Sequence, residues 1–160
     1  MAVDTLPDFQ NQEPKLKIQG TVYQPDGTTP AENVILYIYQ TDRQGLYPKK
    51  GNEVGWARRH GYIRGWIKTG NNGKYAFYTF RPAAYPNSQE PEHIHITVKE
   101  PNKNQYYIDE YVFDDDPLLT SSARSSLPKR GGSGIGVPKL INGFFEINRD
   151  IILGLNIPNY

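Results

Sequence analysis

The 160-residue chain contains no cysteine, carries almost no net charge and has no long apolar run. Without cysteine there is no disulfide framework, thiolate zinc site, iron–sulfur cluster or cysteine nucleophile. The 18 basic and 17 acidic side chains leave a formal charge of +1 and are scattered along the sequence, so we expect no nucleic-acid partner. No apolar run approaches the roughly 18 residues of a membrane-spanning helix, so we expect no membrane span.

The first residues, Met1 to Pro7, show neither the basic nor the apolar region of a signal peptide. The compartment is therefore open between the cytoplasm, which is the default, and export of a protein whose signal sequence has been removed. Residues 1–14 are polar and interrupted by prolines, which predicts a disordered lead. We expect one domain over 15–160, because no internal repeat or linker divides that range.

Short runs of alternating apolar and polar residues, bounded by glycine, proline, asparagine and aspartate, predict strands from about Lys15 onward. In the run 33–39, Leu36 and Ile38 share one face, and both faces are largely apolar or aromatic, which predicts a central strand. The segment 70–73, Gly-Asn-Asn-Gly, predicts a hairpin turn. No helices alternate with the strands, so we expect an all-β fold: an antiparallel two-sheet β-sandwich with long loops.

At most one short helix is expected. Asp116 offers an N-cap and Pro117 a first helical residue, followed by 118–126, and capping explains Asp116 better than a calcium loop does. Two long stretches, 47–65 and 128–138, predict surface loops of functional length. The glycines of the second stretch indicate a flap or turn, because no strand-to-helix context supports a phosphate-binding loop.

Tyrosine is in excess, with 12 residues against 6 phenylalanines and 1 methionine, while only 3 histidines occur. Two of these form His93-Ile94-His95, and residues two apart on a strand present their side chains on the same face. An exposed pair is one interpretation. A cupin-type metal site with Glu100 is another, although Glu100 falls on the opposite strand face and no later histidine follows.

Several short motifs follow one another in a specific order. They are Gly20-Thr21-Val22, Asp26-Gly27, Ile38-Tyr39-Gln40-Thr41-Asp42, Gly45-Leu46-Tyr47, Arg64-Gly65, Asn72-Gly73-Lys74-Tyr75-Ala76-Phe77, Pro82-Ala83-Ala84-Tyr85-Pro86 and His93-Ile94-His95. In this order and spacing, residues 15–117 resemble the intradiol ring-cleavage dioxygenases, nearest to the protocatechuate dioxygenase side of that family, and suggest a short, divergent member. The resemblance implies that Tyr47, Tyr85, His93 and His95 bind one ferric ion per chain.

The resemblance further implies a non-heme Fe(III) enzyme that uses O2 to cleave a catechol-type diol to a muconate-type diacid, with Tyr85 detaching as the base for one substrate hydroxyl. Phenolate oxygen suits a hard, highly charged cation, which in turn lowers the pKa of the phenol from its usual ~10. The expected partners are therefore a catechol-like molecule and O2. The family also implies self-association of the chain.

Two positions depart from the family pattern. Glu90 replaces an arginine three residues before the first histidine of the pair, and Glu110 replaces a glutamine on the later strand. Two carboxylates near the metal would repel a carboxylate-bearing substrate, which favours an uncharged or differently substituted catechol. Alternatively, an arginine from the loops pairs with Glu90 or supplies the missing charge. The candidates for this are Arg43, Arg58, Arg59, Arg64 and Arg124.

Further residues are candidates for the substrate pocket. The candidate substrate-contacting residues are Glu90, Glu110, Tyr39, His60, Tyr62 and Arg64. His60 lies in the long loop and is either a surface histidine or a proton-handling residue. A second hypothesis follows from the two glutamates: a β-sandwich binding module that retains the metal site and has lost turnover.

Overall fold

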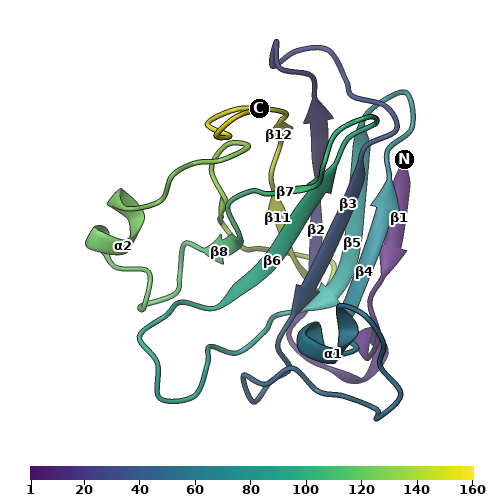
Figure 1. Cartoon of the computed structure of the whole chain (residues 1–160). Helices are drawn as coiled ribbons and strands as arrows, with labels where there is room; N and C mark the ends of the chain where they lie inside the picture. The colour runs from purple at the N-terminus through teal and green to yellow at the C-terminus, as the bar shows by residue number, and fades with distance from the viewer.

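The computed structural model describes residues 1–160 as a β-sandwich of two six-stranded sheets (Figure 1). The first sheet has the order β1-β5-β2-β11-β10, with β12 also paired to β2. Its strands are β1 Ala2–Thr5, β2 Lys15–Tyr23, β5 Lys74–Phe80, β10 Lys139–Ile141, β11 Phe144–Asn148 and β12 Ile151–Ile152. The second sheet has the order β4-β3-β6-β8-β9, with β7 paired to β6. Its strands are β3 Ile35–Gln40, β4 Arg64–Lys68, β6 His93–Lys99, β7 Tyr106–Tyr107, β8 Tyr111–Phe113 and β9 Ile135–Gly136.

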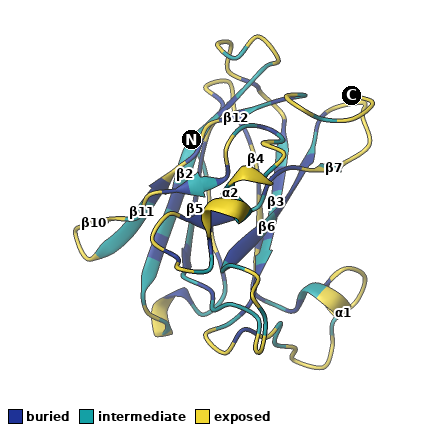
Figure 2. Ribbon diagram, turned by 90° about the vertical axis from the view of Figure 1, so that its left-hand side faces the viewer, coloured by how far each residue is buried: buried dark blue, intermediate teal, exposed yellow.

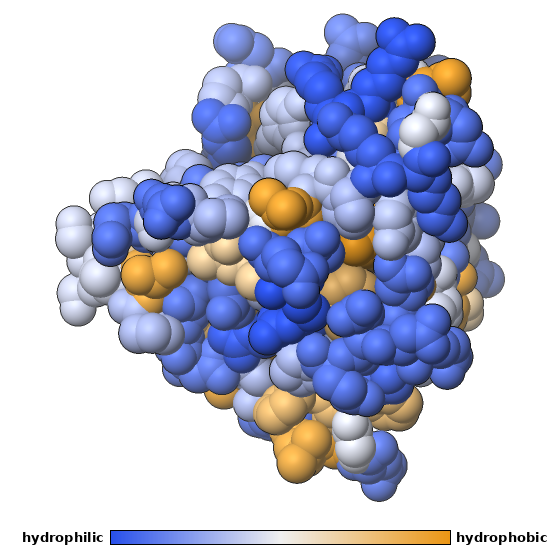
Figure 3. Space-filling view, turned by 90° about the horizontal axis from the view of Figure 1, so that it is seen from below, coloured by the Kyte–Doolittle hydropathy of each residue, from blue (hydrophilic) through white to orange (hydrophobic).

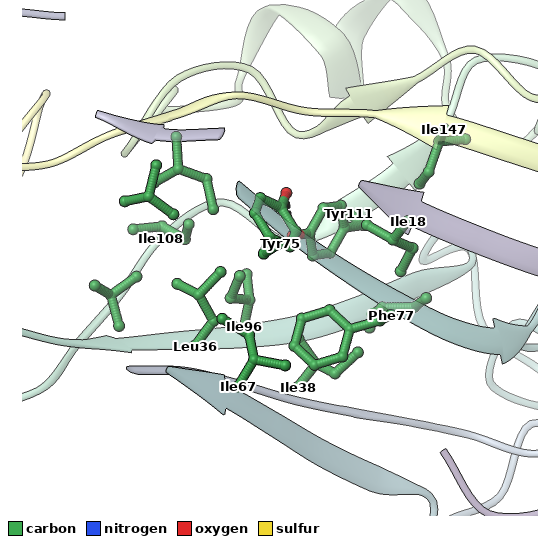
Figure 4. Close-up of a cluster of buried hydrophobic side chains, with 14 of the residues drawn as sticks. Ile18, Leu36, Ile38, Ile67, Tyr75, Phe77, Ile96, Ile108, Tyr111 and Ile147 are labelled. Atoms are coloured by element: carbon green, nitrogen blue, oxygen red, sulfur yellow. Dashed lines mark hydrogen bonds between the residues drawn. The ribbon is translucent and has the colours of Figure 1, made fainter. Parts of the chain in front are cut away.

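The core lies between the two sheets and forms one cluster of 22 buried residues. Leu36 and Ile38 of β3 are fully buried, while Tyr37 and Tyr39, which alternate with them, are only partly covered, so the alternation predicts the inward face correctly. Aliphatic side chains from both sheets meet there around aromatic rings such as Phe77 (Figure 4). Figure 2 shows that burial follows the central strands, whereas the two helices and the loops are largely exposed.

The sandwich is confirmed, but its sheets are mixed and not purely antiparallel. The pairs β1–β5, β2–β11, β2–β12 and β8–β9 are parallel. In each of these pairs the two strands are far apart in the sequence, so no turn signal announces them. The predicted turn at 70–73 does form, with the Gly73 N–H donating to Gly70 O at 3.0 Å. However, the strands that it joins, β4 and β5, belong to different sheets.

Two short α-helices are present where at most one was expected. The helix α1, Ala57–His60, lies inside the segment 47–65 that the sequence predicts as a loop. The helix α2, Ser121–Ser125, begins later than expected, because Thr120 accepts the N-cap hydrogen bond from Ala123 N at 3.2 Å. Asp116 instead holds the preceding turn, accepting from Leu118 N at 2.9 Å. Neither helix is long or apolar enough to cross a membrane.

Residues 1–14 are part of the fold and not the expected disordered lead. β1 pairs in parallel with β5, and a 3₁₀ turn follows at Phe9–Asn11. Leu6 and Phe9 anchor the segment, with only 2% and 8% of their surface exposed. The Asp4 carboxylate accepts from Trp66 N at 3.0 Å. The segment therefore forms the edge strand of the first sheet and contacts β4, the edge strand of the second.

Candidate metal centre

The candidate donors lie on the outer face of the second sheet, at the end of the sandwich that carries α1 (Figure 1). Along β6, His93 and His95 alternate with Ile94 and Ile96, whose side chains are buried in the core at 0% and 1% exposure. Both imidazoles therefore share the outer face, as the alternation predicts. In the ladder between β3 and β6, Tyr39 stands opposite His95.

Two tyrosines reach the histidine pair from loops. Tyr47 lies between β3 and α1, and Tyr85 lies between β5 and β6. The Tyr47 hydroxyl is 2.8 Å from His95 Nε2 and contacts the Tyr85 hydroxyl. The Tyr85 hydroxyl is 3.1 Å from His93 Nε2 and 3.3 Å from His95 Nε2. The two Nε2 atoms are 3.1 Å apart, so four donor atoms converge on one point.

The other nitrogen of each histidine is held by an acceptor. His93 Nδ1 donates to Pro91 O at 2.7 Å, and His95 Nδ1 lies 3.4 Å from Glu110 Oε1. Because these acceptors fix the proton on Nδ1, the lone pair of each Nε2 points into the cluster. An acceptor on the second ring nitrogen is typical of metal-ligating imidazoles, whereas an exposed histidine pair needs none.

The chemistry of the cluster fits a hard, highly charged cation. Burial raises the pKa of both Tyr47 and Tyr85, so without a nearby cation the two phenols stay protonated. A hydrogen bond from His95 lowers the pKa of Glu110 and keeps that carboxylate ionised. Two phenol oxygens and two imidazole nitrogens, backed by an anion, make a donor set suited to ferric iron.

Two glycines allow the tyrosine loops to approach this point. A Cβ on Gly45, which has φ +78°, would overlap the carbonyl oxygen of Ala84, next to Tyr85. A Cβ on Gly61, with φ +74°, would lie 2.7 Å from the carbonyl oxygen of Pro48, next to Tyr47. At both positions glycine is therefore required for two reasons: its backbone conformation and the space that its missing side chain leaves.

A hollow of about 310 Å³ opens beside the four donors. It is lined by Tyr39, Tyr47, Arg59, His60, Tyr85, His95 and Tyr107. Tyr39 is stacked between two imidazoles, with centroids 3.7 Å from His60 and 4.4 Å from His95. The Tyr37 hydroxyl is hydrogen-bonded to His60 Nδ1 at 3.0 Å. The end of the molecule around this site is mostly hydrophilic, with only separate small apolar patches (Figure 3).

A family model described as a dioxygenase matches residues 4–143. The chain belongs to the intradiol dioxygenase family. Among curated relatives, it is 27% identical to the protocatechuate 3,4-dioxygenase beta chain of Burkholderia cepacia over 119 residues, which are 69% of this chain and 50% of that one. It is 26% identical to catechol 1,2-dioxygenase 1 of Acinetobacter lwoffii over 147 residues, which are 76% of this chain and 46% of that one. The chain thus spans about half the length of these two dioxygenases.

Solved structures of intradiol dioxygenases share the fold. The dioxygenase domain of a dioxygenase carbohydrate-binding protein fusion from Streptomyces sp. SirexAA-E superposes with a TM-score of 0.69 at 22% identity, covering 89% of this chain and 82% of that one. The 3-chlorocatechol 1,2-dioxygenase of Rhodococcus opacus 1CP gives the same TM-score at 18% identity, covering 95% and 67%.

The structure places the two glutamates that replace family residues outside the lining of the hollow. Glu110 faces His95 from behind, and Glu90 is exposed on the loop before β6. Neither carboxylate is among the lining residues. No ion pair joins Glu90 to an arginine. Burial, with the charges of Glu90 and Glu110, raises the pKa of the Tyr85 phenol, so the two carboxylates act on the hollow from outside its lining. The only charged side chain in the lining itself is that of Arg59.

The remaining pocket candidates divide into two groups. Tyr39 and His60 line the hollow, as expected. Tyr62 instead donates a hydrogen bond to Asp8 of the N-terminal segment, and Arg64 is exposed on β4. The sequence offers no signal for Tyr107, which joins the lining only because β7 pairs with β6.

The cupin-type alternative is not supported. Glu100 lies beyond the far end of β6 from His93 and His95. Its buried carboxylate accepts hydrogen bonds from Tyr106 at 2.6 Å and from Tyr160 at 2.8 Å. Glu100 is thus part of a separate cluster that fixes the C-terminal residues.

Proposed function

We propose that this chain is a non-heme Fe(III) dioxygenase that uses O2 to open the ring of a catechol-type diol between its two hydroxyl-bearing carbons, giving a muconate-type diacid. The observation that supports this most is the convergence of the Tyr47 and Tyr85 hydroxyls with the Nε2 atoms of His93 and His95. Family membership supports the reaction class.

The four donors would hold one ferric ion per chain. Bound there, Fe(III) would act as a Lewis acid that favours loss of the protons of both catechol hydroxyls and activates the diol toward O2. The Tyr85 oxygen, which would be a phenolate once the cation has lowered its pKa, is the proposed proton acceptor for one of those hydroxyls and would become a neutral phenol. It is carried by a loop and not by a strand, which leaves it freer to move than the two histidines on β6.

Other residues orient the site. The stacked rings of Tyr39 and His60 form one wall of the hollow, against which the flat face of an aromatic substrate can pack. Glu110 keeps the proton of His95 on Nδ1, so that Nε2 remains a donor.

The test is consumption of O2 and formation of product with a panel of catechols by the ferric protein. With O2 labelled in heavy oxygen, we expect both labelled atoms in one ring-opened diacid. An iron-loaded protein that consumes no O2 with any catechol would contradict the proposed dioxygenase activity and favour the hypothesis of a binding module that retains the metal site. Formation of an aldehyde by cleavage outside the diol would contradict the intradiol assignment.

Substitution of the proposed base gives a sharper test. Tyr85→Phe removes the hydroxyl, and we expect kcat to fall by about 10²–10⁴-fold, the usual contribution of a positioned general base. Tyr107→Phe is the matched control, because Tyr107 also lines the hollow but contacts none of the four donors. Equal kcat values for the two variants would remove Tyr85 from the proposed role.

A further inference from the structure

The hollow beside the four donors contains a single charged side chain. Of its seven lining residues, four are tyrosines and two are histidines that stack on Tyr39. The seventh is Arg59. Arg59 sits in the last turn of α1, directly before His60. Its guanidinium makes no ion pair and no hydrogen bond within the chain.

The other arginines of the surrounding loops are accounted for. Arg43 donates to the carbonyl oxygen of Arg81 at 2.8 Å, and Arg124 pairs with Asp114 at 2.7 Å. Arg58 precedes Arg59 on α1 but does not line the hollow, and neither does Arg64. Arg59 is therefore the one arginine of this group that is both unpaired and in the hollow.

The nearby acids form no ion pair with Arg59. Glu110 is engaged by His95 Nδ1, and Glu90 lies exposed outside the lining. A substrate in the hollow therefore meets a free guanidinium at the α1 wall. A guanidinium presents a planar fork of N–H donors that matches a carboxylate or sulfonate and binds it in a bidentate manner.

We propose, on the basis of the proposed function, that Arg59 determines specificity by binding an anionic substituent of the catechol ring. The diol of such a substrate faces Tyr47, Tyr85, His93 and His95, the ring packs on the Tyr39 and His60 wall, and the acidic group points to α1. This preference is the opposite of what Glu90 and Glu110 indicate in the sequence, because Arg59 lines the hollow and neither carboxylate does.

The test compares two catechols with the ferric protein: 3,4-dihydroxybenzoate, which carries a carboxylate, and 4-methylcatechol, which is neutral and of similar size. The variants are Arg59→Gln and, as a control on the same helix, Arg58→Gln. For Arg59→Gln we expect kcat/KM for the acid to fall by about tenfold to a hundredfold, mainly through KM, as for loss of a charge-assisted hydrogen bond. For 4-methylcatechol, kcat/KM should stay within about twofold, and Arg58→Gln should change neither substrate.

Two results would overturn the assignment. One is a wild-type protein that prefers the neutral catechol, and the other is an equal loss for both substrates in Arg59→Gln. If no catechol is turned over, the proposed function fails separately. Anaerobic binding titrations with the same two compounds then test Arg59. Tighter binding of the acid by the wild type that is lost in Arg59→Gln supports the role of Arg59, and equal binding of the acid by wild type and Arg59→Gln refutes it.

Discussion

At the scale of single residues, the orientation of the two histidines depends on what holds their Nδ1 atoms. His93 uses a backbone carbonyl, which no substitution can remove, whereas His95 uses the Glu110 carboxylate at 3.4 Å. A carboxylate in this position strengthens the donor nitrogen more than a neutral amide does. Glu110 is therefore better described as support for His95 than as a residue that repels the substrate.

Substitution of Glu110 tests this support. Glu110→Ala should lower the affinity for iron by about 10–100-fold, the usual cost of losing such a partner, whereas Glu110→Gln keeps an acceptor oxygen and should lose less. Competition with a ferric chelator measures the affinity. Glu32→Gln is the control, because Glu32 is exposed on the loop before β3 and its side chain makes no ion pair or hydrogen bond. An Ala variant with unchanged affinity would show that His95 needs no carboxylate.

His60 gives the stability of the protein a defined pH dependence. Burial, together with the positive charge of Arg59, lowers the pKa of His60 to about 4 from the ordinary value of 6.5. Between these two values the unfolded chain binds a proton that the folded chain does not, so stability should fall as the pH falls from about 6.5 to about 4. In urea unfolding, the difference in the free energy of unfolding between wild type and His60→Gln should narrow or reverse as the pH falls through this window. A difference in the free energy of unfolding that is independent of pH would contradict a partly buried, neutral imidazole.

At the scale of elements, the site depends on how closely two loops approach each other. The turn that contains Gly45 packs on the backbone of Ala84, and the Ala83 N–H donates to Asp42 O at 3.0 Å. These contacts bring together Tyr47, on the loop after β3, and Tyr85, on the loop that crosses from β5 of the first sheet to β6 of the second. The sequence shows the glycine but not its contact partner, because the two loops are almost 40 residues apart.

Two alanine substitutions separate the effect of backbone conformation from that of space. Gly45 and Gly55 both have positive φ, but a Cβ on Gly55 would meet nothing within 4 Å. Each change should cost about 1–2 kcal/mol for the left-handed backbone, and only Gly45→Ala should add a clash and lose bound iron. Metal analysis and urea unfolding of both variants measure this. Equal iron contents would show that the loops tolerate separation.

The N-terminal strand should contribute to stability. Leu6 is 2% exposed and packs in the core, whereas Val3 on β1 is 50% exposed. Leu6→Ala should lower the free energy of unfolding by about 2–5 kcal/mol, and Val3→Ala by much less. Denaturant unfolding measures both. If both substitutions lower the free energy of unfolding only slightly, residues 1–14 are not anchored, as the sequence-based prediction of a disordered lead would have it.

At the scale of the whole molecule, local patterns predict the sandwich, and motif order predicts the four converging side chains. The alternation around Leu36 and the spacing of His93 and His95 suffice for these inferences, because each depends on residues close in the chain. Parallel pairing of β1 with β5 depends on contacts some 70 residues apart and leaves no local signal. The same applies to Arg59, which is one of five open candidates until α1 places it at the hollow.

The central claim is that Tyr47, Tyr85, His93 and His95 together hold ferric iron. The most direct measurement is metal analysis with a visible absorption spectrum of the purified, ferric-reconstituted protein. We expect one iron per chain and a broad charge-transfer band from phenolate bound to Fe(III), which Tyr47→Phe should shift or abolish and Tyr107→Phe should leave unchanged. A colourless protein that retains no iron after reconstitution would contradict the claim.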